Sequence, residues 1–149
     1  MPLKIAIAAD HAGFEMKTHI VAHLKAQGHE VEDLGTYSDE RVDYPDFGFK
    51  LAQLVTEGGV DFGIGLCGSG IGMDIALNRF STIRSALCTS VEMATLARRH
   101  NDANVLTLGA RLTDEKLALA CVDVFLTENF EGGRHATRVD KLSSCGVKI

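Results

Sequence analysis

The stretch Phe62-Gly63-Ile64-Gly65-Leu66-Cys67-Gly68-Ser69-Gly70-Ile71-Gly72 joins an apolar run to a cysteine and three alternating glycines. The run 62–66 suits an interior parallel strand, and the glycines let the backbone turn tightly into a helix that we expect to start at about residue 71. Free N–H groups at such a corner can hold a phosphate or stabilise an oxyanion, and the positive potential of a helix start favours a thiolate at Cys67. The junction is therefore our first candidate for chemistry.

One simpler interpretation of this stretch stands beside the catalytic one. Cysteine is also a common small apolar filler at a strand end, so Cys67 alone decides little. The glycine spacing is neither the GxGxxG dinucleotide pattern nor a Walker loop, because no Lys-Ser or Lys-Thr follows. The glycines, more than the thiol, favour a functional corner.

The rest of the chain alternates strand-like apolar runs with segments of helical periodicity. Predicted strands cover 4–9, 30–34, 62–66, 84–87 and 105–108, and predicted helices cover 14–27, 45–56, 71–78, 91–100, 114–126 and 137–144. Pro45 suits a first helical turn, Ser90 and Thr113 suit N-caps, and Gly28 and Gly58 suit helix ends. The alternation predicts an α/β fold: an open parallel sheet of five strands with helices on both faces, a Rossmann-like three-layer sandwich closed by a C-terminal helix.

Ligands of open parallel sheets bind at the carboxyl ends of the strands. Polar groups follow three of the predicted strands at that edge: Asp10-His11, Cys67-Gly68-Ser69 and Gly109-Ala110-Arg111. We therefore expect these three strand tips to share one cleft.

Length and composition limit the class of protein. With 149 residues, 46% of them hydrophobic, the chain suits a single domain spanning 1–149. A net charge of −5 argues against a nucleic-acid surface, although Arg98-Arg99-His100 and Arg134-His135 are candidate anion ligands. The N-terminal pattern carries no secretory signal and no apolar run is long enough for a membrane span, so we expect a cytoplasmic protein without membrane or nucleic-acid partners.

Cysteine and histidine spacing gives little sign of a metal or a disulfide framework. The four cysteines are scattered, so we expect reduced thiols. His19 and His23 have the i,i+4 spacing of half a zinc site, but no HExxH surrounds them, and two histidines on a solvated helix face explain the pattern better. We expect no metal and no cofactor.

Five motifs together resemble the type B ribose-5-phosphate isomerases, within the ribose/galactose isomerase superfamily. They are Ala9-Asp10-His11-Ala12-Gly13, Asp43-Tyr44-Pro45, Leu66-Cys67-Gly68-Ser69-Gly70-Ile71-Gly72, Arg99-His100-Asn101-Asp102-Ala103-Asn104 and Glu131-Gly132-Gly133-Arg134-His135, in matching order over nearly the whole chain. The resemblance implies interconversion of D-ribose 5-phosphate and D-ribulose 5-phosphate, in the non-oxidative pentose phosphate pathway, through an enediolate. It also implies a dimer or tetramer with active sites between subunits.

The resemblance implies a role for each matching position. Cys67 is the base that moves the carbon-bound proton, Ser69 assists proton movement between the two sugar oxygens, and His100 opens the furanose ring. The backbone N–H groups of residues 68–72, which include Gly68, Gly70, Ile71 and Gly72, would stabilise the enediolate. The sugar would contact Asp10, His11, Asn101 and Tyr44, and the phosphate would bind Arg111, Arg134, His135 and Arg138.

Several of these residues have ordinary structural explanations as well. Ser69 suits a helix cap, His100 and Asn101 suit a helix C-terminus, and the arginines suit a solvated basic helix start. Tyr44 suits a residue that staples its helix to the fold. The guanidinium fork nevertheless binds phosphate oxygens in pairs, and histidine exchanges protons near pH 7.

Three rival functions remain open at this level. An allose-6-phosphate or galactose-6-phosphate isomerase differs only in the distance from the proton-transfer centre to the phosphate clamp. A cysteine-nucleophile hydrolase or acyl transferase would use Cys67 and His100 as a dyad. A non-catalytic sugar-phosphate binding module would use the glycine loop as a phosphate cradle.

Overall fold

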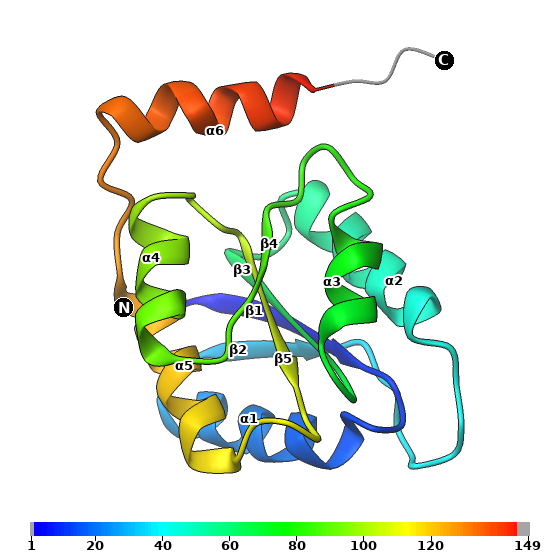
Figure 1. Cartoon of the computed structure of the whole chain (residues 1–149). Coiled ribbons are helices and arrows are strands. Elements are labelled where there is room, and N and C mark those ends of the chain that lie inside the picture. The colour runs from blue at the N-terminus through cyan, green and yellow to red at the C-terminus, as the bar shows by residue number, and fades with distance from the viewer. Residues whose placement is uncertain (1, 146–149) are drawn as a thin grey trace.

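A five-stranded parallel sheet with the order β2-β1-β3-β5-β4 forms the centre of the molecule (Figure 1). The structure, a computed structural model, describes residues 2–145. The strands are β1 (Lys4–Ala9), β2 (Glu30–Asp33), β3 (Phe62–Cys67), β4 (Ser85–Leu87) and β5 (Val105–Gly109). The helices are α1 (Phe14–Ala26), α2 (Tyr44–Thr56), α3 (Ile71–Leu77), α4 (Val91–Arg99), α5 (Glu115–Thr127) and α6 (Arg134–Ser144). The fold class read from the sequence is confirmed.

Capping residues and glycines in the sequence predicted most of the helix ends correctly. Ser90 caps α4, where its hydroxyl accepts the Met93 N–H at 3.1 Å, and Gly28 and Gly58 adopt positive φ after their helices. Thr113 was the wrong cap for α5, because the Asp114 carboxylate accepts the Leu117 N–H at 2.8 Å. Asp114 is therefore the N-cap of α5, and Thr113 lies one residue before the cap.

The last helix begins three residues earlier than the sequence indicated. Gly132 and Gly133 have φ of 68° and 56°, and α6 starts directly after them at Arg134. These two glycines turn the chain directly into the helix. Arg134 is therefore the first residue of α6, whereas the sequence had placed it in the loop before the helix. Arg134 and Arg138 then lie one turn apart on the same helix.

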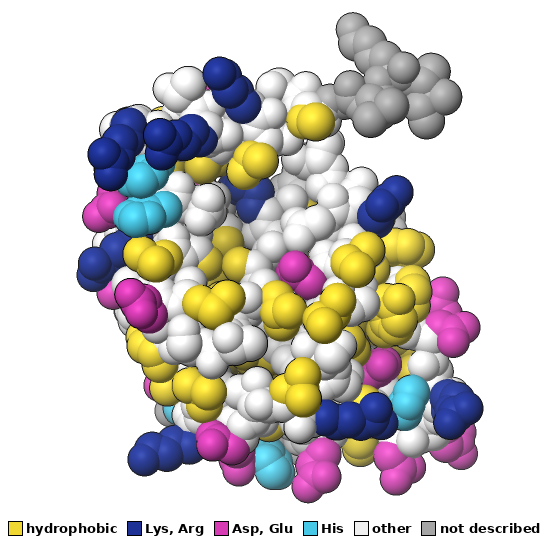
Figure 2. Space-filling view, in the orientation of Figure 1, with side chains coloured by type: hydrophobic (Ala, Val, Ile, Leu, Met, Phe, Trp, Pro, Cys, Tyr) yellow, Lys and Arg dark blue, Asp and Glu magenta, His cyan; other side chains and the backbone are white. Residues whose placement is uncertain are grey.

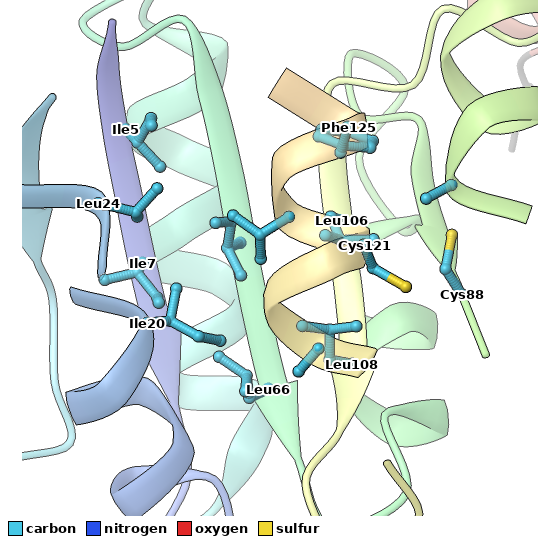
Figure 3. Close-up of a cluster of buried hydrophobic side chains, with 14 of the residues drawn as sticks. Ile5, Ile7, Ile20, Leu24, Leu66, Cys88, Leu106, Leu108, Cys121 and Phe125 are labelled. Atoms are coloured by element: carbon cyan, nitrogen blue, oxygen red, sulfur yellow. The ribbon is translucent and has the colours of Figure 1, made fainter. Parts of the chain in front are cut away.

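The sheet carries different side chains on its two faces. On one face large apolar groups from β1, β3 and β5 pack against α1, α4 and α5, including Ile5, Ile7, Leu66, Leu106 and Leu108 (Figure 3). The opposite face, under α2 and α3, carries small residues at the middle of the sheet: Ala6, Ala8, Gly63 and Gly65. A Cβ at Gly65 would lie 2.9 Å from Met73 Cγ, so α3 sits closer to the sheet than a larger side chain would allow.

This asymmetry decides where Cys67 points. Successive side chains of a strand alternate between the faces, so Cys67 shares the α2/α3 face with Gly63 and Gly65. The carboxyl ends of the strands lie together at one end of the sheet, whereas α6 lies beyond the end formed by their amino ends (Figure 1). None of the described helices is long and apolar enough to cross a membrane.

Candidate active site

Cys67 is the last residue of β3, and the chain turns from it into α3 within four residues. Its side chain is buried, with 4% of the residue exposed, and its Sγ accepts the Gly70 N–H at 3.2 Å. A hydrogen-bond donor and the start of a helix both favour negative charge on the sulfur. The turn therefore gives the sulfur a backbone hydrogen bond beside the start of a helix.

Two of the glycines are required by close contacts. Gly70 has φ +79°, and a Cβ there would lie 2.5 Å from Leu87 Cδ1. At Gly72 a Cβ would lie 2.5 Å from the ring of Tyr44, which therefore covers the first turn of α3. Larger residues at either position would displace the turn or the aromatic ring beside Cys67.

A cavity of about 330 Å³ opens at Cys67 and collects the tips of β1, β3 and β5. Its lining is Asp10, Tyr44, Cys67, Gly68, Ser69, Gly72, Arg111 and Leu112. The structure thus brings together one or more polar residues from each of the three strand ends but leaves out His11, and it adds Leu112, which sequence reasoning missed. Nothing in the spacing around Leu112 marked it, since it is one exposed apolar residue in a loop.

Asp10 and His11 take different positions although they are adjacent. The Asp10 carboxylate is buried and accepts the N–H groups of Ala12 and Gly13 at 3.0 and 3.2 Å, which shapes the turn into α1. His11 Nδ1 accepts the Val42 N–H at 3.2 Å, so a neutral ring carries its proton on Nε2. His11 lines a separate cavity of about 380 Å³, outside the lining of the Cys67 cavity.

The loop amides are only partly free for a ligand. The Gly70 N–H is directed at Cys67, and the Ile71 N–H donates to Ser69 Oγ at 3.2 Å, so Ser69 does cap the turn. The Gly68 and Ser69 N–H groups have no acceptor within residues 2–145. The donors available to an oxyanion are therefore fewer than the sequence suggested, and Ser69 keeps its hydroxyl proton to donate.

Arg111 is held against the cysteine loop by backbone contacts. Its N–H donates to Gly68 O and the Ala110 N–H donates to Cys67 O, both at 2.9 Å. The guanidinium passes so close to Gly68 that a Cβ there would lie 3.0 Å from Nη1. An exposed guanidinium thus borders the cavity that contains Cys67.

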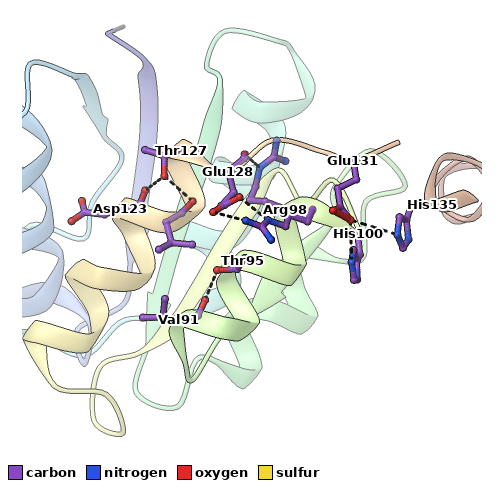
Figure 4. Close-up of polar contacts among 11 residues, drawn as sticks. Val91, Thr95, Arg98, His100, Asp123, Thr127, Glu128, Glu131 and His135 are labelled. Carbon is purple, nitrogen blue, oxygen red and sulfur yellow. Dashed lines mark hydrogen bonds and ion pairs between the residues drawn. The ribbon is translucent and has the colours of Figure 1, made fainter. Parts of the chain in front are cut away.

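A second polar cluster contains His100, Glu131 and His135 (Figure 4). The two imidazole rings stack with centroids 4.2 Å apart and planes 11° apart. Glu131 Oε1 lies 3.3 Å from His100 Nε2 and 3.8 Å from His135 Nε2. Burial, followed by the charges of His100 and Arg134, lowers the pKa of His135. Sequence reasoning gave Glu131 no role, although its i,i+4 spacing to His135 was visible.

Basic side chains surround this second cluster. Figure 2 shows dark blue lysine and arginine atoms over the start of α6, beside cyan histidine atoms. Arg134 and Arg138 are exposed, while His135 faces His100 and Glu131. In one chain, His135 therefore supports His100 more directly than it presents itself to a phosphate.

The two clusters lie at opposite ends of the sheet. His100 and Asn101 precede β5, whereas Cys67 pairs with Gly109 at the far end of that strand. Five residues of extended strand span about 16 Å. Asn101 lines a different cavity, of about 600 Å³, with Arg84 and Leu142 among its other walls. One chain therefore cannot bring Asn101, His100 or the α6 residues to its own Cys67.

The histidines singled out as half a zinc site have separate partners. His19 Nδ1 lies 3.1 Å from Glu115, and His23 Nε2 lies 2.7 Å from Asp123. Within residues 2–145, the only group of three metal-capable side chains that come together is His100, Glu131 and His135.

Comparisons with known proteins agree on one family. Residues 5–142 match the family described as Ribose/Galactose Isomerase. The chain is 47% identical over 141 residues to ribose-5-phosphate isomerase B of Escherichia coli (strain K12), covering 95% of each. Its structure is similar to that of a ribose 5-phosphate isomerase from Thermotoga maritima, with a TM-score of 0.94, 52% identity and coverage of 96% of this chain and 99% of the other. A ribose-5-phosphate isomerase B from Mycoplasma genitalium, solved with bound ribulose 5-phosphate, has a TM-score of 0.89 and 43% identity, covering 95% and 94%.

Proposed function

The chain belongs to the ribose/galactose isomerase family and interconverts ribose 5-phosphate and ribulose 5-phosphate, and from that premise we propose how its own residues carry the reaction. An aldose-ketose isomerase must move one proton between C1 and C2 and another between the two oxygens. The observation that carries our assignment is the Cys67 sulfur, which accepts the Gly70 N–H inside a cavity bordered by Arg111. No other described cysteine lines that cavity.

Cys67 takes the proton from C2 of the open-chain aldose and returns it to C1. The electron pair left on C2 makes an enediolate, whose negative oxygen is stabilised by the Gly68 and Ser69 N–H groups. Each such donor contributes about 3 kcal/mol to lowering a barrier of this kind. The Ser69 hydroxyl passes a proton from O2 to O1 so that the carbonyl reforms at C2. Asp10 and Tyr44 close the cavity around the sugar.

The remaining groups act from a second copy of the chain. His100 opens the furanose ring by giving a proton to the ring oxygen, Asn101 binds the sugar, and Arg134 and Arg138 bind phosphate. Because the length of β5, about 16 Å, separates the end of the sheet with Cys67 from the end next to His100 and Asn101, these groups reach a Cys67 cavity only across a subunit interface. Arg111 is then the phosphate ligand from the cysteine side, His135 joins Arg134 and Arg138 at the phosphate, and His11 contacts the sugar.

Apolar side chains on one face support such a homo-oligomer. Ile71 and Ile75 on α3 are 53% and 57% exposed, and Val91, Leu96 and Leu142 are exposed on α4 and α6. Figure 2 shows yellow side chains spread over the face that carries α3, β4 and α4. Monomeric proteins rarely expose apolar groups together in this number, so this face suits contact with an identical subunit.

A complementation experiment tests the shared site. Cys67→Ala and His100→Ala should each be inactive, but unfolding and refolding them as an equal mixture should restore activity. Random pairing makes half the dimers mixed, and each mixed dimer has one complete site out of two, so recovery should reach about one quarter of wild type. Absence of recovery, with dimers confirmed by light scattering, would mean that the two residues do not share a site between subunits.

Isotope exchange tests the chemistry itself. In deuterated water, wild type should place solvent deuterium at C1 of ribulose 5-phosphate, and Cys67→Ala should place none. A covalent thioester found by mass spectrometry would instead favour the cysteine-nucleophile alternative. The geometry already disfavours a dyad within one chain, because Cys67 and His100 lie at opposite ends of the sheet.

A further inference from the structure

The cluster of His100, Glu131 and His135 offers two imidazole nitrogens and one carboxylate oxygen in a small space (Figure 4). All three atoms lie within 4.8 Å of one another. The side chains of His100 and Glu131 are 39% and 49% exposed, and that of His135 is 12% exposed. A small ion can therefore reach the cluster from solvent, although one side of it is covered.

A backbone hydrogen bond fixes the position of each of the three residues. His100 ends α4, where its N–H donates to Leu96 O at 2.9 Å. The Glu131 N–H donates to Arg99 O at 3.0 Å, which fixes the loop against the end of α4. His135 lies in the first turn of α6, with its N–H donating to Gly132 O at 3.1 Å. The cluster thus joins α4 to α6 at fixed backbone positions.

Two of the three distances between the donor atoms are close to those of a tetrahedral metal site. Zinc bonds of about 2.0–2.1 Å to nitrogen and oxygen place neighbouring donors roughly 3.4 Å apart. The Glu131 oxygen is 3.3 Å from one imidazole nitrogen and 3.8 Å from the other. Because the two rings are nearly parallel, at 11°, at least one ring must rotate about its side-chain bonds for both nitrogens to converge on an ion.

We propose that His100 Nε2, His135 Nε2 and Glu131 Oε1 bind one divalent transition-metal ion of the zinc type, with water completing the coordination. Two imidazoles and one carboxylate suit Zn²⁺, whereas Ca²⁺ and Mg²⁺ prefer sites made of oxygen alone. Since ring rotation opposes binding, we expect micromolar affinity.

Metal binding has a consequence for turnover that rests on the proposed function. An ion on Nε2 of His100 takes a ring nitrogen of the residue that we propose opens the furanose ring. Zn²⁺ therefore inhibits the enzyme instead of activating it. The furanose form of ribose 5-phosphate should be affected more than the open-chain ketose. The site would make the isomerase sensitive to free zinc at a position separate from the thiol.

The direct test is competition for Zn²⁺ between the protein and a chromophoric chelator. Wild type should take up one ion per chain, and Glu131→Ala should weaken binding by at least about tenfold. Glu115→Ala is the matched control, because Glu115 pairs with a single surface histidine, His19, and should keep wild-type affinity. His135→Phe keeps an aromatic ring in the stack but no ligand, and should also weaken binding.

Two further arms separate the possible outcomes. Cys67→Ser and Cys145→Ser should bind Zn²⁺ as wild type does, and loss of the ion in either thiol variant, with Glu131→Ala unaffected, would overturn the proposal. Equal affinity of wild type, Glu131→Ala and His135→Phe would overturn it as well. Zinc that binds and is lost in Glu131→Ala, yet leaves wild-type turnover unchanged, would uphold the site and contradict the ring-opening role of His100.

Discussion

Replacing Cys67 by serine removes the assigned base while keeping almost everything around it. Serine keeps an atom that can accept the Gly70 N–H, now 3.2 Å from the sulfur, and it fits a site that is 4% exposed. We expect a loss of about 1 kcal/mol of folding stability, typical of a small change in a packed position. The fold and the binding of substrate should therefore survive.

The effect on turnover should be far larger than the effect on stability. A positioned general base contributes about 10²–10⁴ in rate, which corresponds to roughly 3–5 kcal/mol of barrier. A serine hydroxyl stays protonated at neutral pH, so Cys67→Ser and Cys67→Ala should both lose at least that factor in kcat. Steady-state turnover of ribose 5-phosphate measures the loss, and titration with a non-reacting sugar-phosphate analogue checks that binding persists.

The other buried thiols provide the matched controls. Burial, together with the nearby charges of Cys121 and Asp74, raises the pKa of Cys88 to about 12, and burial also raises the pKa of Cys121. Both stay protonated at neutral pH and neither lines the Cys67 cavity, so serine at Cys88 or Cys121 should change kcat less than about threefold. Turnover near wild type in Cys67→Ser, or an equal loss in Cys88→Ser, would refute the reasoning.

Three other predictions concern the reaction, and one concerns stability. Enzyme stripped of metals should retain full turnover, and activity that is lost to a chelator and restored by one divalent ion would contradict this. His100→Asn should slow the cyclic aldose phosphate more than the ketose phosphate, and equal losses in both directions, after correction for the equilibrium, would remove its role in ring opening. Arg134→Ala and Arg138→Ala should each weaken binding of a ribose-phosphate analogue by about 2 kcal/mol, with partial rescue by lysine, and unchanged titrations in both would exclude them from the site. Lys17→Ala should lower the free energy of unfolding by about 3 kcal/mol in urea denaturation, because the buried ammonium pairs with Asp33 at 2.6 Å, and a change below 1 kcal/mol would show that the pair contributes little.

The fold was predictable because its signals are local. The apolar run at 62–66 and the glycines after it define a strand and a turn without reference to the rest of the chain. The errors were also local: Thr113 and Asp114 can both cap a helix, and only the extended backbone at Asp114 (ψ 162°) distinguishes them. The early start of α6 depended on Gly132 and Gly133 turning the chain by themselves, which composition does not reveal.

The site was predictable only in part, because its halves depend on distances between segments far apart in sequence. The rule that ligands bind at strand ends correctly gathered Asp10, Cys67 and Arg111. It could not reveal that Glu131 lies between His100 and His135, since those contacts join the end of α4 to the start of α6. Sequence spacing also could not show that Ser69 and Cys67 already use two of the loop amides.

The small residues of the sheet connect the fold to the chemistry. Gly63 and Gly65 lie where a strand of an ordinary core would carry valine or isoleucine. The missing side chain at Gly65 lets Met73 of α3 approach β3, and the one at Gly63 leaves room for Leu51 and Val55 of α2. Gly70 lies in the short connection from β3 to α3, where its left-handed conformation accompanies an N–H directed at the sulfur. The packing of α3 beside Cys67 therefore depends on Gly65, two residues earlier in the strand, which does not line the Cys67 cavity. A thiol at the same strand end beneath a more distant helix would be only a buried cysteine.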